Sequence, residues 1–229
     1  MNTMAKKKFI VLCGKEYLLK HSKYSIRGNK SPVHVSDNMS GKMDEIPSIS
    51  TSCLCNKICC ARQKDKKSIC SKCFAVGTIK QYTALGKALR SNFELLNSHV
   101  LDLDLLPRFK STVEIVRIES FGDVASVTQA VNYANIARVN PHVTFGWWTK
   151  NPKICKTAFD KVGKPDNVIL IESSPYLDVE CKPSNEYVDK VFTVFSRENP
   201  QINCGKRSCM GCRRCYRKDT EKEVYELLK

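Results

Sequence analysis

The fold is decided by residues 113–148, which read VEIVRIESFGDVASVTQAVNYANIARVNPHVTFGWW. The apolar run at 113–118 predicts a strand, and residues 124–139 have the apolar spacing of an amphipathic helix. Residues 143–148 predict the next strand. A strand, a helix and a second strand at this spacing form a βαβ unit, in which the two strands run parallel.

The same alternation extends to both sides of this unit. A helix is expected at 152–162, with proline suiting its first turn, and further strands at 168–171 and 191–195. Before the unit, residues 75–88 and 89–101 predict two helices, with Gly86 as the expected break. With only about four units, a closed eight-unit barrel is excluded. We therefore expect an α/β fold with a partial (βα) barrel or an open parallel sheet.

The charge of the chain favours an anionic partner. The sequence has a formal net charge of +15 over 229 residues, which suits a nucleotide or a nucleic acid, although a lysine-rich surface that only aids solubility is an alternative. The N-terminal apolar run at 9–12 is far too short for a signal peptide or a membrane span. We expect a cytoplasmic protein that does not enter a membrane.

Thirteen cysteines, an odd number with strong local grouping, favour metal-binding thiols over a disulfide framework. The C-terminal group follows the last predicted strand and consists of Cys204, Cys209, Cys212 and Cys215. Four thiolates at this spacing favour an iron–sulfur cluster of the [4Fe-4S] type, with zinc as the alternative. The basic residues of this loop, which include Lys206, Arg207, Arg213, Arg214 and Arg217, would offset the cluster charge or contact phosphates.

The N-terminal group has six thiols: Cys53, Cys55, Cys59, Cys60, Cys70 and Cys73. Cys59, Cys70 and Cys73 are the preferred ligands, because Cys70 and Cys73 have the spacing of a metal knuckle. Three thiolates would leave one coordination position open, as catalytic metal sites do. The alternative is a fourth ligand from Cys55 or Cys60 and a purely structural zinc.

Polar residues follow the predicted strands, where parallel α/β sheets bind their ligands. We expect Asp123, Lys150 and Asn151 to act on the substrate, and Glu119, Gly122 and Ser173 to bind a cofactor. Loop solvation or helix capping is the alternative for each, and Asp123 could simply cap the helix that begins near residue 124.

Several of these segments resemble the "gene product 88" domain family of bacteriophages and mobile elements. The resemblance spans residues 46–217 and rests on the runs at 48–52, 70–75, 90–92, 116–123 and 140–150 and on the closing four-cysteine loop. It implies a phage or mobile-element origin. The sequence departs from the family pattern at Phe74, where tyrosine is usual, and in the extra thiols Cys53, Cys55 and Cys60.

The strand, Gly-Asp, helix and strand order is also similar to the half-barrel of radical S-adenosylmethionine enzymes. That resemblance implies an open [4Fe-4S] cluster that binds S-adenosylmethionine. These enzymes characteristically use Cys-x3-Cys-x2-Cys on one loop, whereas here Cys55 and Cys59 are followed directly by Cys60.

These observations predict an irregular basic N-terminal region at 1–45, an α/β metal-binding domain at 46–217 and a C-terminal tail at 218–229. The first functional hypothesis is an iron–sulfur enzyme of phage origin that acts on a nucleotide or nucleic acid. The second is a zinc-stabilised nucleic-acid-binding protein without catalysis. The third is a phage protein that binds a host protein.

Overall fold

A six-stranded parallel sheet forms the centre of the computed structural model, which describes residues 9–37, 41–205 and 207–228. Each strand pairs with the one that follows it in sequence, so the spatial order is the chain order. The strands are β3 (Ser48–Ile49), β4 (Ile115–Ile118), β5 (Thr144–Thr149), β6 (Val168–Ser173), β7 (Lys190–Phe195) and β8 (Glu223–Leu227). The expected parallel α/β sheet is confirmed.

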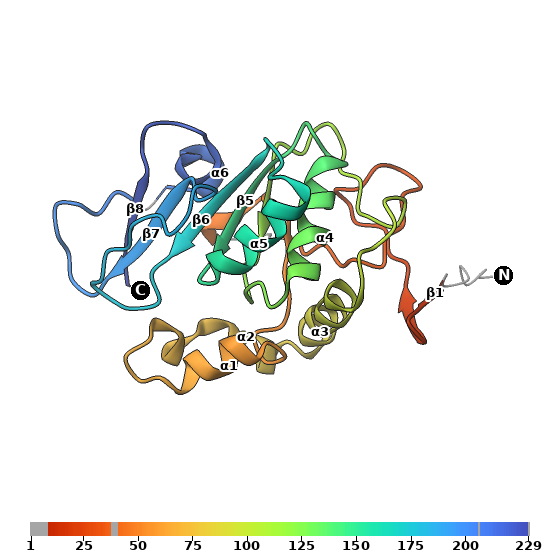
Figure 1. Cartoon of the computed structure of the whole chain (residues 1–229), viewed down its shortest axis with the longest axis horizontal. Helices are drawn as coiled ribbons and strands as arrows, with labels where there is room; N and C mark the ends of the chain where they lie inside the picture. Colours follow the sequence, from red (N-terminus) through yellow and green to blue (C-terminus); the bar gives the residue numbers. More distant parts are fainter. Residues whose placement is uncertain (1–8, 38–40, 206, 229) are drawn as a thin grey trace.

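Six α-helices and a hairpin surround the sheet in the described residues (Figure 1). The helices are α1 (Lys57–Lys64), α2 (Phe74–Gln81), α3 (Thr83–Ser98), α4 (Val127–Arg138), α5 (Pro152–Val162) and α6 (Cys209–Cys212). Short 3-10 helices lie at η1 (Gly41–Met43), η2 (Ile69–Lys72) and η3 (Arg214–Tyr216). The hairpin of β1 (Phe9–Leu12) and β2 (Lys15–Leu18) stands apart from the main sheet.

The two tryptophans of β5 show how the two faces of the sheet are covered. Trp147 is fully buried against Tyr133 of α4 and Phe159 of α5, with ring centroids 5.2 and 5.9 Å away. Trp148 points to the other face, because neighbouring strand residues alternate. There it packs 5.6 Å from the ring of Tyr216, in the cysteine-rich C-terminal loop. Helices therefore cover one face, and the C-terminal cysteine loop covers the other.

Residues 53–82, called the rim segment below, cross the carboxyl ends of the strands (Figure 1). Hydrogen bonds attach this segment to the loops that follow two strands. The Asn56 side chain donates to the Asp123 carbonyl at 2.8 Å, and the Ile69 amide donates to the Pro175 carbonyl at 2.9 Å. The cysteines of the N-terminal group are thereby held at the edge of the sheet where parallel α/β proteins bind ligands.

The break between the two helices after Cys73 falls at Tyr82 and not at Gly86. Tyr82 leaves the helical conformation, with φ −108° and ψ 85°. Gly86 lies inside α3, where a Cβ atom would come 3.1 Å from Ile79 Cγ2 and 3.2 Å from the Ile79 carbonyl oxygen. The glycine thus permits α3 to approach α2 and does not end a helix.

The prediction of a tail at 218–229 is wrong for residues 223–227, which form β8 and pair with β7. This strand reads Glu-Val-Tyr-Glu-Leu and lacks the strict alternation of apolar and polar residues that indicates a strand. Residues 33–35 form no strand, because Ser31 and Ser36 on either side form only isolated bridges. The rest of the expected N-terminal region is irregular apart from the hairpin and η1, and its residues 1–8 and 38–40 lie outside the described part.

Candidate functional site at the rim of the sheet

Asp123, predicted to act on the substrate, holds the rim together. Its Oδ1 accepts hydrogen bonds from the Thr149 hydroxyl at 2.7 Å and the Val124 amide at 2.8 Å. Its Oδ2 accepts the Lys150 amide at 2.9 Å and lies 3.4 Å from Arg62 Nη1. Burial raises the pKa of Asp123, while Thr149, Lys150 and Arg62 act in the opposite direction. The carboxylate is therefore occupied in joining β4, β5 and the rim segment.

Asn151 and Lys150 follow β5 and differ in how their side chains are used. Asn151 is buried, accepts a bond from Arg62 at 2.9 Å and donates to the Val124 carbonyl at 2.9 Å. Lys150 contributes its backbone to this network, and among the described contacts its ammonium group makes no hydrogen bond or ion pair. Its charge instead acts on Asp123 and Cys73. Of the three predicted substrate residues, Lys150 has a free functional group.

Glu119, Gly122 and Ser173, the predicted cofactor residues, are all in crowded positions. Glu119 is buried and accepts hydrogen bonds from Tyr133, Gln129 and Thr51, at 2.6 to 3.0 Å. A Cβ atom on Gly122 would meet the Thr51 carbonyl oxygen at 2.6 Å and Glu119 Oε2 at 2.9 Å. Ser173 is buried at the end of β6. Glu119 and Gly122 thus serve the close packing of the turn after β4 against Thr51.

The rim segment brings Cys53 next to Cys73, a pairing that the sequence reasoning missed. The Cys53 and Cys73 thiols interact with each other, and this interaction raises the pKa of Cys53 and lowers that of Cys73. Cys73 is also the N-cap residue of α2, where the nearby amides of Ala75 and Val76 lower its pKa further. These features favour a Cys73 thiolate.

Cys59 lies deeper, in a small apolar core with Cys53, Ala75 and Ile79. Burial raises its pKa, and Cys70 lies close enough to act on it electrostatically. The Cys60 thiol instead donates to the backbone carbonyls of Cys53 and Leu54, both at 3.6 Å. Cys53, which lies close enough to interact electrostatically with both Cys59 and Cys73, belongs to the same group as the predicted Cys59, Cys70 and Cys73. Its neighbourhood with Cys73 depends on the path of the rim segment, which no sequence spacing reveals.

The four C-terminal thiols form a second group, on the face of the sheet that is opposite to α4 and α5. Burial raises the pKa of Cys204, Cys209 and Cys215, to about 12 for Cys215, and the thiols of the group also act on one another. The Lys42 ammonium donates to Cys204 Sγ at 3.6 Å and to Glu226 at 2.7 Å. Segments remote in sequence thus meet at this loop.

All thirteen cysteines are free thiols. As they stand, no three histidine, cysteine or acidic side chains in the described residues are arranged to hold a metal ion. In the rim group, the Cys53 and Cys73 thiols interact with each other, and the Cys60 thiol forms a hydrogen bond with the Cys53 backbone carbonyl. The donor chemistry suits a soft metal ion, but the sulfurs would have to turn toward a common point to bind one.

Comparison with known proteins gives one family. The model of the family described as Gene product 88 matches residues 22–224. The chain belongs to the gene product 88 family. This confirms the resemblance seen in the sequence and extends it toward both ends of the chain. No curated protein and no solved structure matches significantly, and the resemblance to radical S-adenosylmethionine enzymes finds no support.

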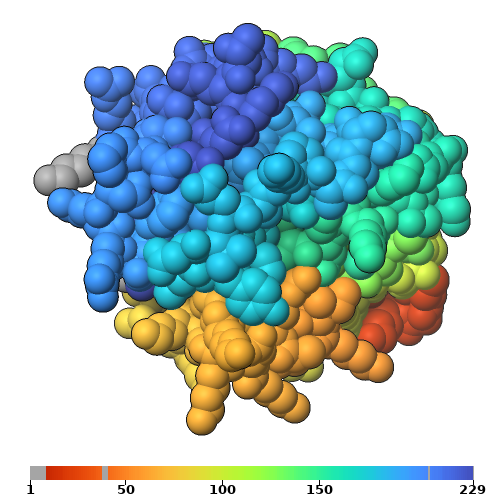
Figure 2. Space-filling view, turned by 60° about the vertical axis from the view of Figure 1, so that its left-hand side comes forward, coloured from red at the N-terminus to blue at the C-terminus, as the bar shows by residue number. Residues whose placement is uncertain are grey.

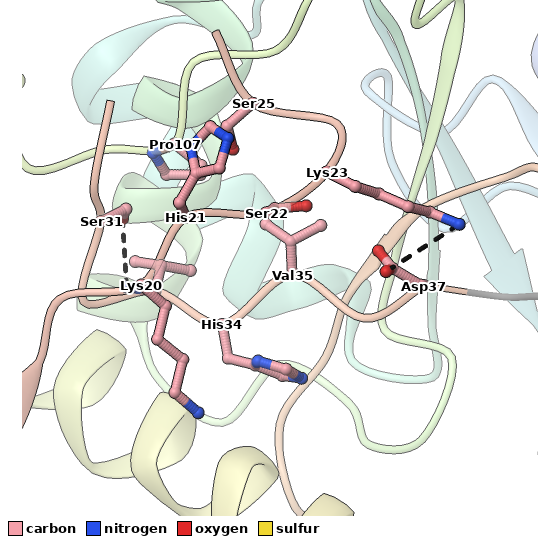
Figure 3. Close-up of a pocket in the computed structure, with 11 residues that line it drawn as sticks. Lys20, His21, Ser22, Lys23, Ser25, Ser31, His34, Val35, Asp37 and Pro107 are labelled. Atoms are coloured by element: carbon pink, nitrogen blue, oxygen red, sulfur yellow. Dashed lines mark hydrogen bonds and ion pairs between the residues drawn. The ribbon is translucent and has the colours of Figure 1, made fainter. Parts of the chain in front are cut away.

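This gene product 88 protein also has a cavity of about 180 Å³ away from both cysteine groups (Figure 3). The N-terminal stretch from Lys20 to Asp37 and Pro107 line it, and Lys23 reaches toward Asp37 with 3.9 Å between Nζ and Oδ2. None of the predicted site residues borders this cavity. In the described part of the chain, no helix has the length and apolar character needed to cross a membrane.

Proposed function

We propose that this gene product 88 protein binds metal through two cysteine centres, one at the rim of the sheet and one in the C-terminal loop. The observation that supports this most is the gathering of Cys53, Cys59, Cys70 and Cys73 at the carboxyl rim. Reduced thiols in such a group are ligands for an iron–sulfur cluster or zinc. The rim is also where parallel α/β folds place their chemistry.

The rim centre is the one suited to catalysis. The charge of Lys150 acts on Cys73, and its ammonium group makes no hydrogen bond or ion pair among the described contacts, so it can hold an anionic substrate near the centre. The surplus of positive charge makes a nucleotide or nucleic acid the preferred substrate. Arg62, Asp123 and Asn151 act as positioning residues, since their side chains fix the loops around Lys150.

Cys53 decides between an open and a closed rim centre. If Cys59, Cys70 and Cys73 alone hold the metal, one position is open for a substrate or for S-adenosylmethionine. If Cys53 is the fourth ligand, the centre is closed and structural. A Cys53→Ser variant that keeps its full metal content supports the open, enzymatic centre, and a variant that loses the rim metal supports the closed one.

Metal analysis of protein purified without oxygen tests the proposal as a whole. Iron, zinc and acid-labile sulfide per chain are measured in the wild type, in a triple variant with Cys59, Cys70 and Cys73 changed to alanine, and in one with all four C-terminal cysteines changed. Each variant should lose the metal of its own centre and keep the other. A Cys13→Ser, Cys181→Ser double variant, which changes thiols outside both groups, should keep both.

Three outcomes would count against the proposal or against its iron–sulfur form. A wild type without bound metal would overturn the proposal, and so would a metal content that neither cysteine variant reduces. Zinc in both centres without sulfide would exclude the iron–sulfur enzyme. It would favour the alternative of a zinc-stabilised nucleic-acid-binding protein. The third hypothesis, binding to a host protein, has no support from the features described above and stays a prediction.

A further inference from the structure

The positive charge of the chain is concentrated in the rim segment and the helix that follows it. Between residues 53 and 92 there are nine lysines and arginines and one acidic residue, Asp65, a net charge of +8 out of +15 for the whole chain. Figure 2 shows this part of the molecule, coloured orange to yellow, forming one side of the surface with long side chains extending into solvent. More than half of the net charge thus belongs to one side of the protein.

Most of these cations are exposed and have no acidic partner. In the described part of the chain, eight of them are exposed and take part in none of the ion pairs: Lys57, Lys64, Lys66, Lys67, Lys72, Lys80, Lys87 and Arg90. The ninth, Arg62, binds Asp123. Exposed cations without carboxylate partners are free to neutralise phosphates.

The C-terminal loop, where the sequence suggested phosphate contacts, is different. Its Arg213 pairs with Glu114 at 2.6 Å and its Arg214 with Glu221 at 2.9 Å. Arg217 lies 3.9 Å from Asp219. Arg207 is exposed and takes part in none of the ion pairs, and Lys206 lies outside the described residues. Because acidic side chains already balance three arginines of this loop, the rim segment, with its eight unpaired cations, is the better phosphate-binding surface.

Exposed aromatic rings lie among the free lysines. Phe74, the first residue of α2, is 67% exposed, and Tyr82, between α2 and α3, is 56% exposed. Phe74 is held in place by Phe121, with ring centroids 5.8 Å apart. Large aromatic side chains are seldom left this exposed, and base stacking on such rings is how proteins bind single strands without reading sequence.

We propose that the exposed side of the rim segment and α3 binds single-stranded nucleic acid. The lysines neutralise the backbone phosphates, and Phe74 and Tyr82 stack with bases. This goes beyond the proposed metal centres and does not depend on metal, since every residue that it uses lies on the outer surface. It also brings a strand next to the rim that Lys150 borders.

Fluorescence anisotropy with a labelled 20-nucleotide oligo-dT and a labelled 20-base-pair duplex tests this, with the full chain at several salt concentrations. We expect the single strand to bind more tightly. With five phosphates neutralised, the logarithm of the binding constant should fall with the logarithm of salt concentration with a slope of about −3.5. Equal or tighter binding of the duplex would overturn the single-strand assignment.

Two sets of variants locate the surface. Changing Lys64, Lys66 and Lys67 to glutamate should weaken binding at least tenfold and flatten the salt dependence. The matched control changes Lys30, Lys110 and Lys161 to glutamate, which are exposed lysines outside the surface, with the same change in net charge. Phe74→Ala and Tyr82→Ala should each weaken binding about tenfold and leave the salt slope unchanged.

Equal weakening by both lysine triples would overturn the proposed surface, as would the absence of binding to any nucleic acid at low salt. Circular dichroism checks that each variant is folded. Metal content is measured on the same samples. Binding without metal, or metal without binding, therefore separates this proposal from the proposed function.

Discussion

At the scale of single residues, the buried carboxyl group of Glu119 links the stability of the protein to pH. Burial raises its pKa from 4.5 to about 7, although Tyr133 and Thr51 donate hydrogen bonds that lower it. The native state therefore binds this proton more tightly than the unfolded chain. Relative to a residue that does not titrate, the protein loses stability as the pH rises from about 4.5 to 7, by about 3 kcal/mol in total.

A Glu119→Gln variant isolates this contribution. Between pH 5 and pH 8, the free energy of unfolding of the variant should rise by about 3 kcal/mol relative to that of the wild type. This change is expected whatever the difference between the two proteins at pH 5. Urea unfolding of both proteins at several pH values measures the difference. A difference that does not change with pH would show that Glu119 titrates normally in the folded protein.

Gly146 in β5 allows the C-terminal loop to lie against the sheet. A Cβ atom at this position would lie 2.5 Å from Cε1 of Tyr216 and 2.9 Å from Cζ3 of Trp148. Gly146→Ala should therefore destabilise the protein by about 1–3 kcal/mol. Gly77→Ala, in α2 with nothing within 4 Å, is the control and should stabilise by about 0.5–1 kcal/mol.

A double variant shows whether Tyr216 is the cause. With Tyr216 changed to alanine, the Gly146→Ala change should cost less stability than in the wild type, because the two closest contacts are gone and only that with Trp148 remains. The stabilities come from urea unfolding. If Gly146→Ala costs the same with and without Tyr216, the loop does not pack on β5 as described.

At the scale of elements, Asn56 starts α1 and fastens it to the rim. Its side chain accepts bonds from the amides of Ile58 and Cys59, at 2.9 and 3.3 Å, and donates to the Asp123 carbonyl. Asn56→Ala should lower the free energy of unfolding by about 2 kcal/mol or more, because both the helix cap and a buried hydrogen bond are lost. Asn56→Ser, which can still cap the helix, should recover about 1 kcal/mol. Equal loss in the two variants would contradict a capping role.

The elements with strong apolar periodicity were predictable from the sequence. The expected helix at 152–162 coincides with α5, and the expected strand at 191–195 is within one residue of β7. The missed elements lack such a pattern. α1 has the sequence KICCARQK, with no continuous apolar face, and β3 has two residues that need β4 beside them.

The candidate site was predictable only in part, because its contacts are tertiary. The grouping of polar strand ends at one rim followed from the parallel sheet. The network that joins Asp123 and Asn151 to Arg62 could not be predicted in this way, because Arg62 lies 61 residues before Asp123 and 89 residues before Asn151. The same holds for Cys53, which reaches Cys73 only because the rim segment turns back across the strand ends.

At the scale of the whole molecule, β8 is the last strand of the sheet and covers the edge of β7. Val224 in this strand is fully buried, and the Tyr225 hydroxyl donates to Glu180 at 2.9 Å. A chain that ends at Lys222 would leave β7 as an unpaired, apolar edge, so we expect it to aggregate. A chain that ends at Leu228 should behave like the wild type. A soluble, cooperatively unfolding protein from the shorter chain would show that β8 is dispensable.

We propose that thiolates from distant parts of the chain hold metal in both cysteine groups. X-ray absorption at the iron and zinc edges, on full-length protein purified without oxygen, identifies the atoms that bind this metal. We expect a ligand shell of sulfur at about 2.3 Å in the wild type, and about half as much metal per chain when Cys204, Cys209, Cys212 and Cys215 are replaced. A shell of nitrogen and oxygen, or folded protein with no iron or zinc above background, would contradict it.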